Sequence, residues 1–145
     1  MLTTYFAHFG SDERHGSYVV TFPDPDNGAT QGESIKEAHT MEQDLLACIL
    51  NELIKCGGSV PAAKKQRGRD FHLVSLPAFQ AAKVALYLVS RKSRLSKAEL
   101  SRRVGIAKAN VDRLFDLDHA SRLDQIEAAF HALGKRLEVA VRNAA

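Results

Sequence analysis

Residues 96–114, SKAELSRRVGIAKANVDRL, decide the fold of the C-terminal half of this 145-residue chain. Ser96 can cap the amide of Glu99 while Glu99 reaches back, and this capping box predicts the start of a helix. The small Ser101 allows two helices to cross closely, and Gly105 suits the tight turn between them. The aliphatic residues are spaced as in two packed helices: Leu100, Val104, Ile106, Val111 and Leu114. The spacing predicts a helix-turn-helix.

The second helix of this motif, over residues 108–116, is expected to turn polar side chains outward. Arg suits the edge of guanine, Asn suits adenine, and Lys anchors the phosphate backbone. Ala107 stands where Ser or Thr is expected to cap this helix, and Asp112 adds a charge that repels phosphate, so we expect Asp112 to turn sideways toward an arginine. The candidate DNA-binding residues are Lys97, Arg102, Lys108, Ala109, Asn110 and Arg113.

A plain helical hairpin would show the same caps and spacing, so charge has to separate the two interpretations. Residues 1–63 carry three basic and nine acidic side chains, a net charge of about −6, and residues 64–145 carry seventeen basic and eight acidic ones, about +9. Clustered Lys and Arg are the electrostatic footprint of polyanion binding. We therefore expect the basic half to hold DNA and the acidic half to hold a cationic protein.

The acidic half reads as a short mixed domain. The runs TTYFAHF at 3–9 and SYVVTF at 17–22 predict a hairpin, ATQGE at 29–33 a short third strand, and FHLVSL at 71–76 a fourth. Between the last two, a capping box of Ser34 and Glu37 opens a helix that ends before Gly57 and Gly58. The helix's expected inward stripe is Ile35, Ala38, Met41, Leu45, Ile49, Leu53 and Cys56, widened by Leu46, Leu50 and Ile54.

The rest of the basic half predicts two more helices, over 77–93 and 121–134. The first should bury Phe79, Ala82, Val84, Ala85, Leu88 and Val89. In LEVAV at 137–141, apolar residues alternate as in a strand, but no neighbouring segment could pair with it. This pattern favours exchange of the strand with a second copy of the chain across a two-fold axis. A dimer would also place two recognition helices about 34 Å apart on a palindromic operator. The fold class is α+β: β-β-β-α-β over 1–76, then a helical domain over 77–145.

Metal, cofactor and catalytic sites find no support in the pattern. The six histidines show no HxH or HExxH spacing, and no CxxC completes a zinc site, so we expect no metal and no cofactor. No Ser-His-Asp or Cys-His spacing indicates an enzyme. Cys48 and Cys56 are expected to be reduced and partly buried. Loop geometry and a solvated helix face account for the carboxylates that a two-metal nuclease would need: Asp24, Asp26, Glu37 and Glu42.

No run of about 18 apolar residues could cross a bilayer, and the first residues lack the order of a signal peptide. We therefore expect a cytoplasmic protein.

Several strings along nearly the whole chain resemble the HicB family of antitoxins, in the subgroup with a helix-turn-helix. The resemblance implies an N-terminal partial ribonuclease-H-like domain that covers the active surface of a HicA-type, messenger-RNA-cleaving toxin. It also implies a C-terminal domain that represses the shared operon, and it brings no catalytic carboxylate set onto this chain. The strings are FPD at 22–24, TQG at 30–32, EA at 37–38, AELSRRVG at 98–105, RLFDLDHASRLDQIEAA at 113–129 and ALGK at 132–135.

An acidic domain suits this role, because a ribonuclease must be basic to hold RNA, and complementary charge speeds association. Asp24, Asp26 and Glu33 are the candidate toxin contacts, with a solvated loop as the equal alternative. The expected partners are the toxin, double-stranded operator DNA and further copies of the chain, as a homodimer or tetramer. The alternative function is a stand-alone helix-turn-helix regulator whose N-terminal domain senses a small molecule. A third interpretation, a nuclease with its own carboxylates, would require metal-dependent RNA cleavage.

Overall fold

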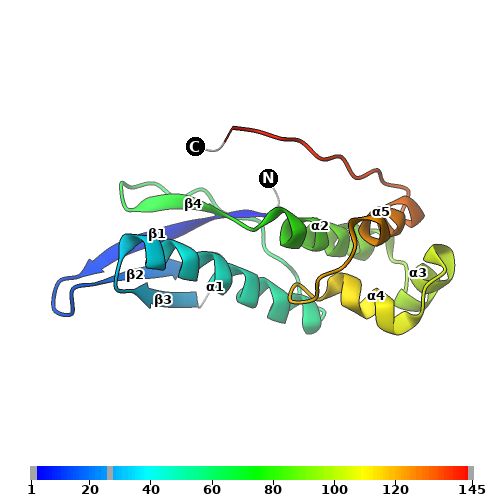
Figure 1. Ribbon diagram of the computed structural model, residues 1–145, viewed down its shortest axis with the longest axis horizontal. Helices are drawn as coiled ribbons and strands as arrows, with labels where there is room; N and C mark the ends of the chain where they lie inside the picture. The colour runs from blue at the N-terminus through cyan, green and yellow to red at the C-terminus, as the bar shows by residue number, and fades with distance from the viewer. Residues whose placement is uncertain (1–2, 26–27, 144–145) are drawn as a thin grey trace.

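The structure is a computed structural model that describes residues 3–25 and 28–143. It is a mixed α+β fold (Figure 1), and its first five elements follow the expected order β-β-β-α-β. The elements are β1 (Thr4–Asp12), β2 (Ser17–Phe22), β3 (Gly28–Gly32), α1 (Ile35–Lys55), β4 (Phe71–Ser75), α2 (Ala78–Ser93), α3 (Lys97–Val104), α4 (Lys108–Phe115) and α5 (Leu123–Ala132).

The four strands form one antiparallel sheet in the order β3-β2-β1-β4. The chain leaves the sheet for α1 and returns at β4, which pairs with β1 so that Tyr5 lies opposite Val74. Helix α1 packs along the sheet (Figure 1) and approaches β3 closely at Gly32. A Cβ at Gly32 would lie 2.5 Å from the backbone nitrogen of Ala38, so a larger residue there would force α1 away from the sheet.

Helix α1 begins as expected but is rotated relative to the predicted stripe. Ser34 Oγ accepts a hydrogen bond from the Glu37 amide (3.1 Å), while the Glu37 carboxylate accepts one from the amide of Glu33 (2.9 Å), one residue earlier than predicted. The prediction that Ile35 and Met41 face inward is wrong, since both are exposed. The buried line runs at intervals of four: Ala38, Glu42, Leu46, Leu50 and Ile54. Glu42 is the polar member of this line, so a search for apolar residues alone did not identify the line as the buried one.

The C-terminal helices pack on one another, α2 against α4 and α5, and α3 against α4 and α5. Their core is aliphatic and aromatic, with Leu100, Leu114 and Ile126 almost fully buried. Helix α2 is also rotated relative to the prediction, because its buried positions are Lys83, Val84, Leu86 and Tyr87. A lysine in this line was not expected.

The segment after α5 is extended and runs from the helical end back toward the sheet end of the molecule (Figure 1). Within the described part of this single chain it pairs with no strand, so the strand expected at 137–141 is not formed here. Leu137 packs against the core, whereas Val139 is 76% exposed and Val141 is 95% exposed. Three apolar side chains at alternate positions thus follow one another, and the last two are uncovered.

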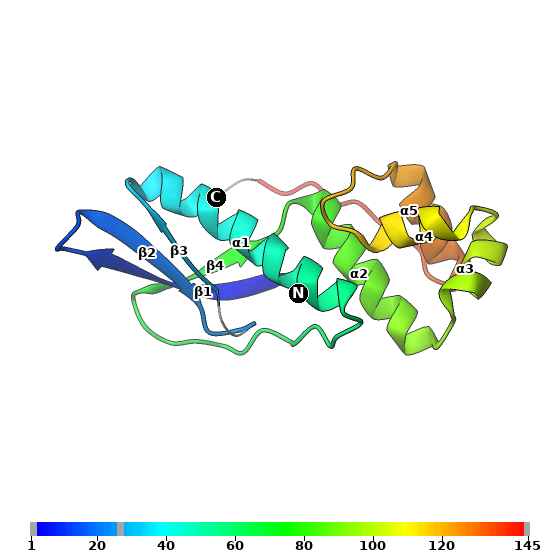
Figure 2. The ribbon, with the colours of Figure 1, turned by 90° about the horizontal axis from the view of Figure 1, so that it is seen from below.

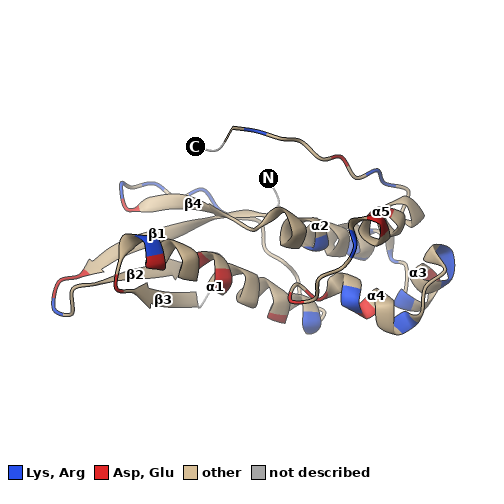
Figure 3. Cartoon of the chain, in the orientation of Figure 1, with Lys and Arg blue, Asp and Glu red and all other residues tan. Residues whose placement is uncertain are grey.

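The molecule is elongated, with the sheet and α1 at one end and α3, α4 and α5 at the other (Figure 2). Charge is less cleanly divided than the sequence suggested (Figure 3), because the basic loop before β4 lies on the sheet end. Ten acidic and seven basic side chains precede Pro77. Lys64 in this loop forms an ion pair with Asp24 (3.6 Å). Over the residues described, the helices are all too short or too polar to cross a membrane.

Candidate functional site

Helices α3 and α4 are joined by a tight turn that local hydrogen bonds hold. Ser96 Oγ accepts from the Glu99 amide (3.1 Å) and caps α3. Gly105 ends α3 with φ at 76°, a conformation that favours glycine, and its amide donates to the Ser101 carbonyl (2.9 Å). The Ser101 hydroxyl donates to the carbonyl of Ile106 (2.5 Å). The start of α3 and the turn between the two helices are therefore held by short-range hydrogen bonds.

One side of α4 is buried and the other is open. Its Val111, Leu114 and Phe115 lie in the core, and its first turn has no side-chain cap at Ala107, as expected. Four of the predicted DNA-binding residues share the open side of this helix: Lys108, Ala109 and Arg113, which are exposed, and Asn110, which is half-buried. Arg113 Nη1 donates to the Asn110 side-chain oxygen (3.3 Å).

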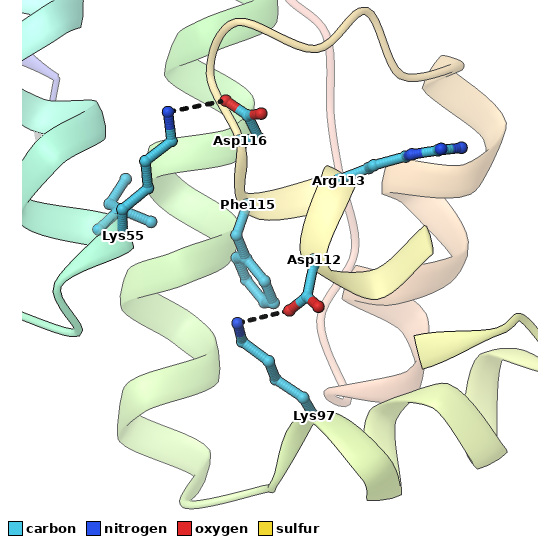
Figure 4. A pocket seen from close by; sticks show the side chains of 7 residues that line it. Lys55, Lys97, Asp112, Arg113, Phe115 and Asp116 are labelled. Carbon is cyan, nitrogen blue, oxygen red and sulfur yellow. Dashed lines mark hydrogen bonds and ion pairs between the residues drawn. The ribbon is translucent and has the colours of Figure 1, made fainter. Parts of the chain in front are cut away.

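The other two predicted residues, Lys97 and Arg102, are exposed but already paired. Lys97 Nζ lies 2.6 Å from a carboxylate oxygen of Asp112 (Figure 4). The prediction that Asp112 turns toward an arginine is therefore wrong, because its partner is a lysine. Arg102 pairs with Glu99. Among the described residues, Lys108 and Arg113 have no carboxylate within 4.0 Å, which leaves their charge the more available.

The capping box of Ser96 and Glu99 forms only in half: the Ser96 hydroxyl accepts from the Glu99 amide, but among the described residues the Glu99 carboxylate does not accept from the Ser96 amide. Its carboxylate instead accepts from Arg103 Nε (3.0 Å) and pairs with Arg102. The hydrogen bond from Arg103 and the charge of Arg102 hold the pKa of Glu99 below its usual value. Two of the basic charges of α3 are thereby partly neutralised.

The end of α4 is held by Lys83, which reaches it from α2. The ammonium group donates to the carbonyls of Arg113 (2.8 Å), Asp116 (2.6 Å) and His119, and the residue is 0% exposed. Burial lowers the pKa of Lys83 to about 8, although Asp116 and Asp118 oppose the shift. A cation at the C-terminal end of a helix satisfies carbonyl groups that have no partner within the helix.

Asn51 connects α1 to the same region. Its side-chain oxygen accepts from the Leu117 amide (3.0 Å), and its nitrogen donates to Asp118 (2.8 Å) and Asp116 (3.2 Å). Burial opposes ionisation of Asp116, yet hydrogen bonds from the Asp118 amide and from Asn51 keep the pKa of Asp116 below its usual value. Lys55 of α1 also lies 3.8 Å from Asp116 (Figure 4). The helix of the sheet end thus contacts the chain directly after α4.

The predicted acidic contacts do not form one compact patch. Asp26 lies outside the described residues. The Asp24 side chain is only 15% exposed, and its charge, after the effect of burial, raises the pKa of Tyr5 to about 12. Glu33 is exposed and follows β3, whereas Asp24 precedes it. β3 has five residues, so about 14 Å separates its two ends.

The structure brings together three side chains that sequence reasoning missed: His39, Glu42 and His72. Glu42 was expected on a solvated face, but it is 5% exposed and lies between the two imidazoles. The spacing of His39 and Glu42 on one helix face was visible in the sequence, while His72 comes from β4. Cys48 and Cys56, expected to be partly buried, are both exposed free thiols.

Comparisons with known proteins agree over most of the chain. Residues 4–85 match the family described as the HicB-like antitoxin of bacterial toxin-antitoxin systems. Antitoxin HicB of Escherichia coli K12 is 33% identical over 124 residues, which are 86% of this chain and 89% of that protein. Antitoxin HicB 2 of Photorhabdus laumondii is 34% identical over 135 residues, 93% of this chain and 94% of that protein.

A chain of a solved toxin-antitoxin complex from Streptococcus pneumoniae is 25% identical and superimposes with a TM-score of 0.46, over 76% of this chain and 93% of that chain. The family match covers more than half of the chain, and the matches to the two antitoxin relatives cover 86% and 93% of it. HicB antitoxins are non-enzymatic regulators, and this chain is not an enzyme, as expected. The chain belongs to the HicB-like antitoxin family of bacterial toxin-antitoxin systems.

Proposed function

We propose that the chain neutralises a HicA-type, messenger-RNA-cleaving toxin and represses its own operon by binding a palindromic operator. The observation that carries the DNA-binding part is the division of α4 into a buried and an open side. Val111 and Leu114 fix the helix on the core, so Lys108 and Arg113 stand outward in positions set by the fold. Operator DNA lies in the bacterial cytoplasm, where we propose that the chain acts.

In this proposal, α3 and α4 are a helix-turn-helix, and α4 enters the major groove. The guanidinium of Arg113 would read a guanine edge, Asn110 an adenine, and Lys108 a phosphate near the start of the helix. Ala109 is small enough to let the helix approach the bases. Lys97 and Arg102 would contribute less, because Asp112 and Glu99 already neutralise part of their charge.

Replacing Arg113 with alanine should weaken operator binding by about 1 to 3 kcal/mol and remove the base preference at one position of each half-site. The guanidinium contributes no ion pair within the described chain, so folding should change little. Titration of labelled operator and of base-substituted operators at one salt concentration would measure both effects. Arg122→Ala is the matched control, since Arg122 is exposed directly before α5 and pairs with Asp124. Equal, sequence-independent losses in both variants would contradict the placement of α4.

A single helix of this length reads few base pairs, and we propose that two copies of the chain bind half-sites one helical turn apart, about 34 Å. The segment 137–141 supports the assembly, because Val139 and Val141 are exposed on one face of an extended stretch. Pairing of this segment with its equivalent in a second copy would cover both valines. The pairing would also satisfy the free backbone groups of each strand.

For toxin binding, we propose that the sheet and α1 form the partial ribonuclease-H-like domain that covers the toxin. The element order β-β-β-α-β, with β4 beside β1 and α1 packed along the sheet, is the basis of this interpretation. Asp24, Asp26 and Glu33 remain the proposed acidic contacts. The structure describes Asp24 and Glu33, and Glu33 is the more accessible of these two, since Asp24 is largely buried beside Lys64.

Reversing the charge of Glu33 should slow association with the toxin. A basic partner is steered by negative potential, so Glu33→Lys is expected to lower the association rate constant about three- to tenfold at low salt, and less at high salt. The partner to use is any small basic protein encoded in the adjacent reading frame, with growth rescue on co-expression as the first readout. Asp124→Lys, an exposed reversal on α5, is the control. An unchanged rate for Glu33→Lys would remove this residue from the interface.

A further inference from the structure

We propose that His39, Glu42 and His72 form a binding site for one divalent transition-metal ion of the zinc type. His39 and Glu42 lie one turn apart on α1, and His72 lies on β4, the edge strand of the sheet. Their ligand atoms all lie within 4.8 Å of one another. Two imidazole nitrogens and one carboxylate are a donor set that zinc uses in proteins, with a fourth position open.

The separations of the three ligand atoms are near those around a bound metal ion without matching them. His39 Nδ1 is 2.8 Å from one oxygen of Glu42, and His72 Nε2 is 2.7 Å from the other. Ligands bound tetrahedrally at 2.0–2.1 Å stand about 3.4 Å apart. The two short contacts would therefore have to open by about 0.6 to 0.7 Å, and because they go to different oxygens of Glu42, the widest separation in the group, which is up to 4.8 Å, would have to close by up to about 1.4 Å.

The buried charge of Glu42 also supports a bound cation. Its side chain is 6% exposed, and a buried carboxylate is costly unless it is paired. Among the residues that the structure describes, the two histidines are its ion-pair partners, and no Lys or Arg nitrogen lies within 4.0 Å. A divalent cation held by all three groups would place two positive charges beside this carboxylate.

The surroundings hold the ligands in place and leave the site accessible. The ring of Phe9 stacks on His39 (5.6 Å between centroids) and meets the ring of His72 edge-on (6.0 Å), which restricts both imidazoles. Gln43 ties α1 to β4 by donating to the Ser75 carbonyl (3.2 Å). A surface hollow on α1, lined by Ile35, Lys36, Thr40 and Gln43, opens at His39 and Glu42.

The test is direct titration of the full chain, without a histidine tag, with zinc chloride in a calorimeter, and with cobalt(II) followed by its visible absorption. We expect one equivalent to bind and the thermal unfolding midpoint to rise, because the ion joins α1 to the edge of the sheet. Glu42→Gln keeps the size of the side chain and removes its charge, and His72→Gln removes a ligand from a partly exposed position. Each variant should bind zinc at least about 100-fold more weakly.

His15→Gln is the matched control. His15 pairs with Asp12 at 2.9 Å with the same spacing of three residues, but the pair is exposed, and neither residue belongs to the three-ligand group. This variant should bind zinc as the wild type does. Absence of zinc and cobalt binding in the wild type would overturn the proposal and leave a hydrogen-bonded His-Glu-His group. Binding that survives in both Glu42→Gln and His72→Gln would also overturn it.

Discussion

Replacing Lys83 with methionine should lower the free energy of unfolding by about 3 kcal/mol, the largest effect that we expect from a single change in this chain. The methionine fills a similar volume but removes the ammonium donor from the carbonyls of Arg113, Asp116 and His119; the first two keep longer hydrogen bonds from backbone amides (3.3 Å and 3.2 Å). Each buried polar group that loses its partner costs about 1 to 3 kcal/mol, and relief from burying a charge offsets part of the sum. Urea denaturation followed by circular dichroism would measure it.

Lys92→Met is the control, because Lys92 lies in the last turn of the same helix and is exposed. It should change stability by less than about 0.5 kcal/mol. A loss as small as this in Lys83→Met would contradict the assignment of Lys83 as the residue that holds the end of α4.

The pKa of Lys83 adds a pH dependence to this difference. Below pH 8 both the folded and the unfolded chain carry the proton, so the cost of burying the charge is fully present. Between pH 8 and 10.5 the folded chain releases the proton while the unfolded chain keeps it, so the contribution of this group to stability rises with pH. The slope is at most about 1.4 kcal/mol per pH unit. The difference in free energy of unfolding between wild type and Lys83→Met should therefore increase with rising pH. The free energy of unfolding of Lys92→Met should change with pH as that of the wild type does.

Replacing Asn51 with leucine should cost about 2 kcal/mol of stability, the second largest effect. Asn51 is 2% exposed, and its loss leaves the buried Leu117 amide without an acceptor and removes one donor each from the carboxylates of Asp116 and Asp118. The measurement is again urea denaturation at neutral pH. Gln43→Leu, an exposed position on α1 with one hydrogen bond, is the control and should stay within about 0.5 kcal/mol.

Asn51→Asp tests whether the hydrogen bonds or the volume matter. Aspartate keeps an acceptor for Leu117 but adds a third carboxylate beside Asp116 and Asp118, so it should destabilise the chain at neutral pH at least as much as leucine does. Part of that loss should return as the pH falls and these carboxylates become protonated. Full stability of Asn51→Asp at neutral pH would show that the contact between α1 and the end of α4 carries little energy.

The main elements were predictable because their signals lie close together in the sequence. Ser34 and Ser96 cap α1 and α3 through amides three residues away, and Gly105 makes the turn that its missing side chain permits. The open side of α4 followed from the spacing of Val111 and Leu114 within that helix. Contacts of this range depend on a few neighbouring residues, so a single sequence is enough to indicate them.

The sequence by itself thus determined the α+β order, the helix starts and the exposed residues of α4, whereas the tertiary structure decided which polar groups are buried. Glu42, Asn51 and Lys83 are polar residues that the sequence analysis did not place in the core, and each is buried. Their partners come from other elements: His72 for Glu42, the Leu117 amide for Asn51 and the Arg113 carbonyl for Lys83. A polar group can be buried only where such a partner replaces water, and that depends on how distant segments meet in space.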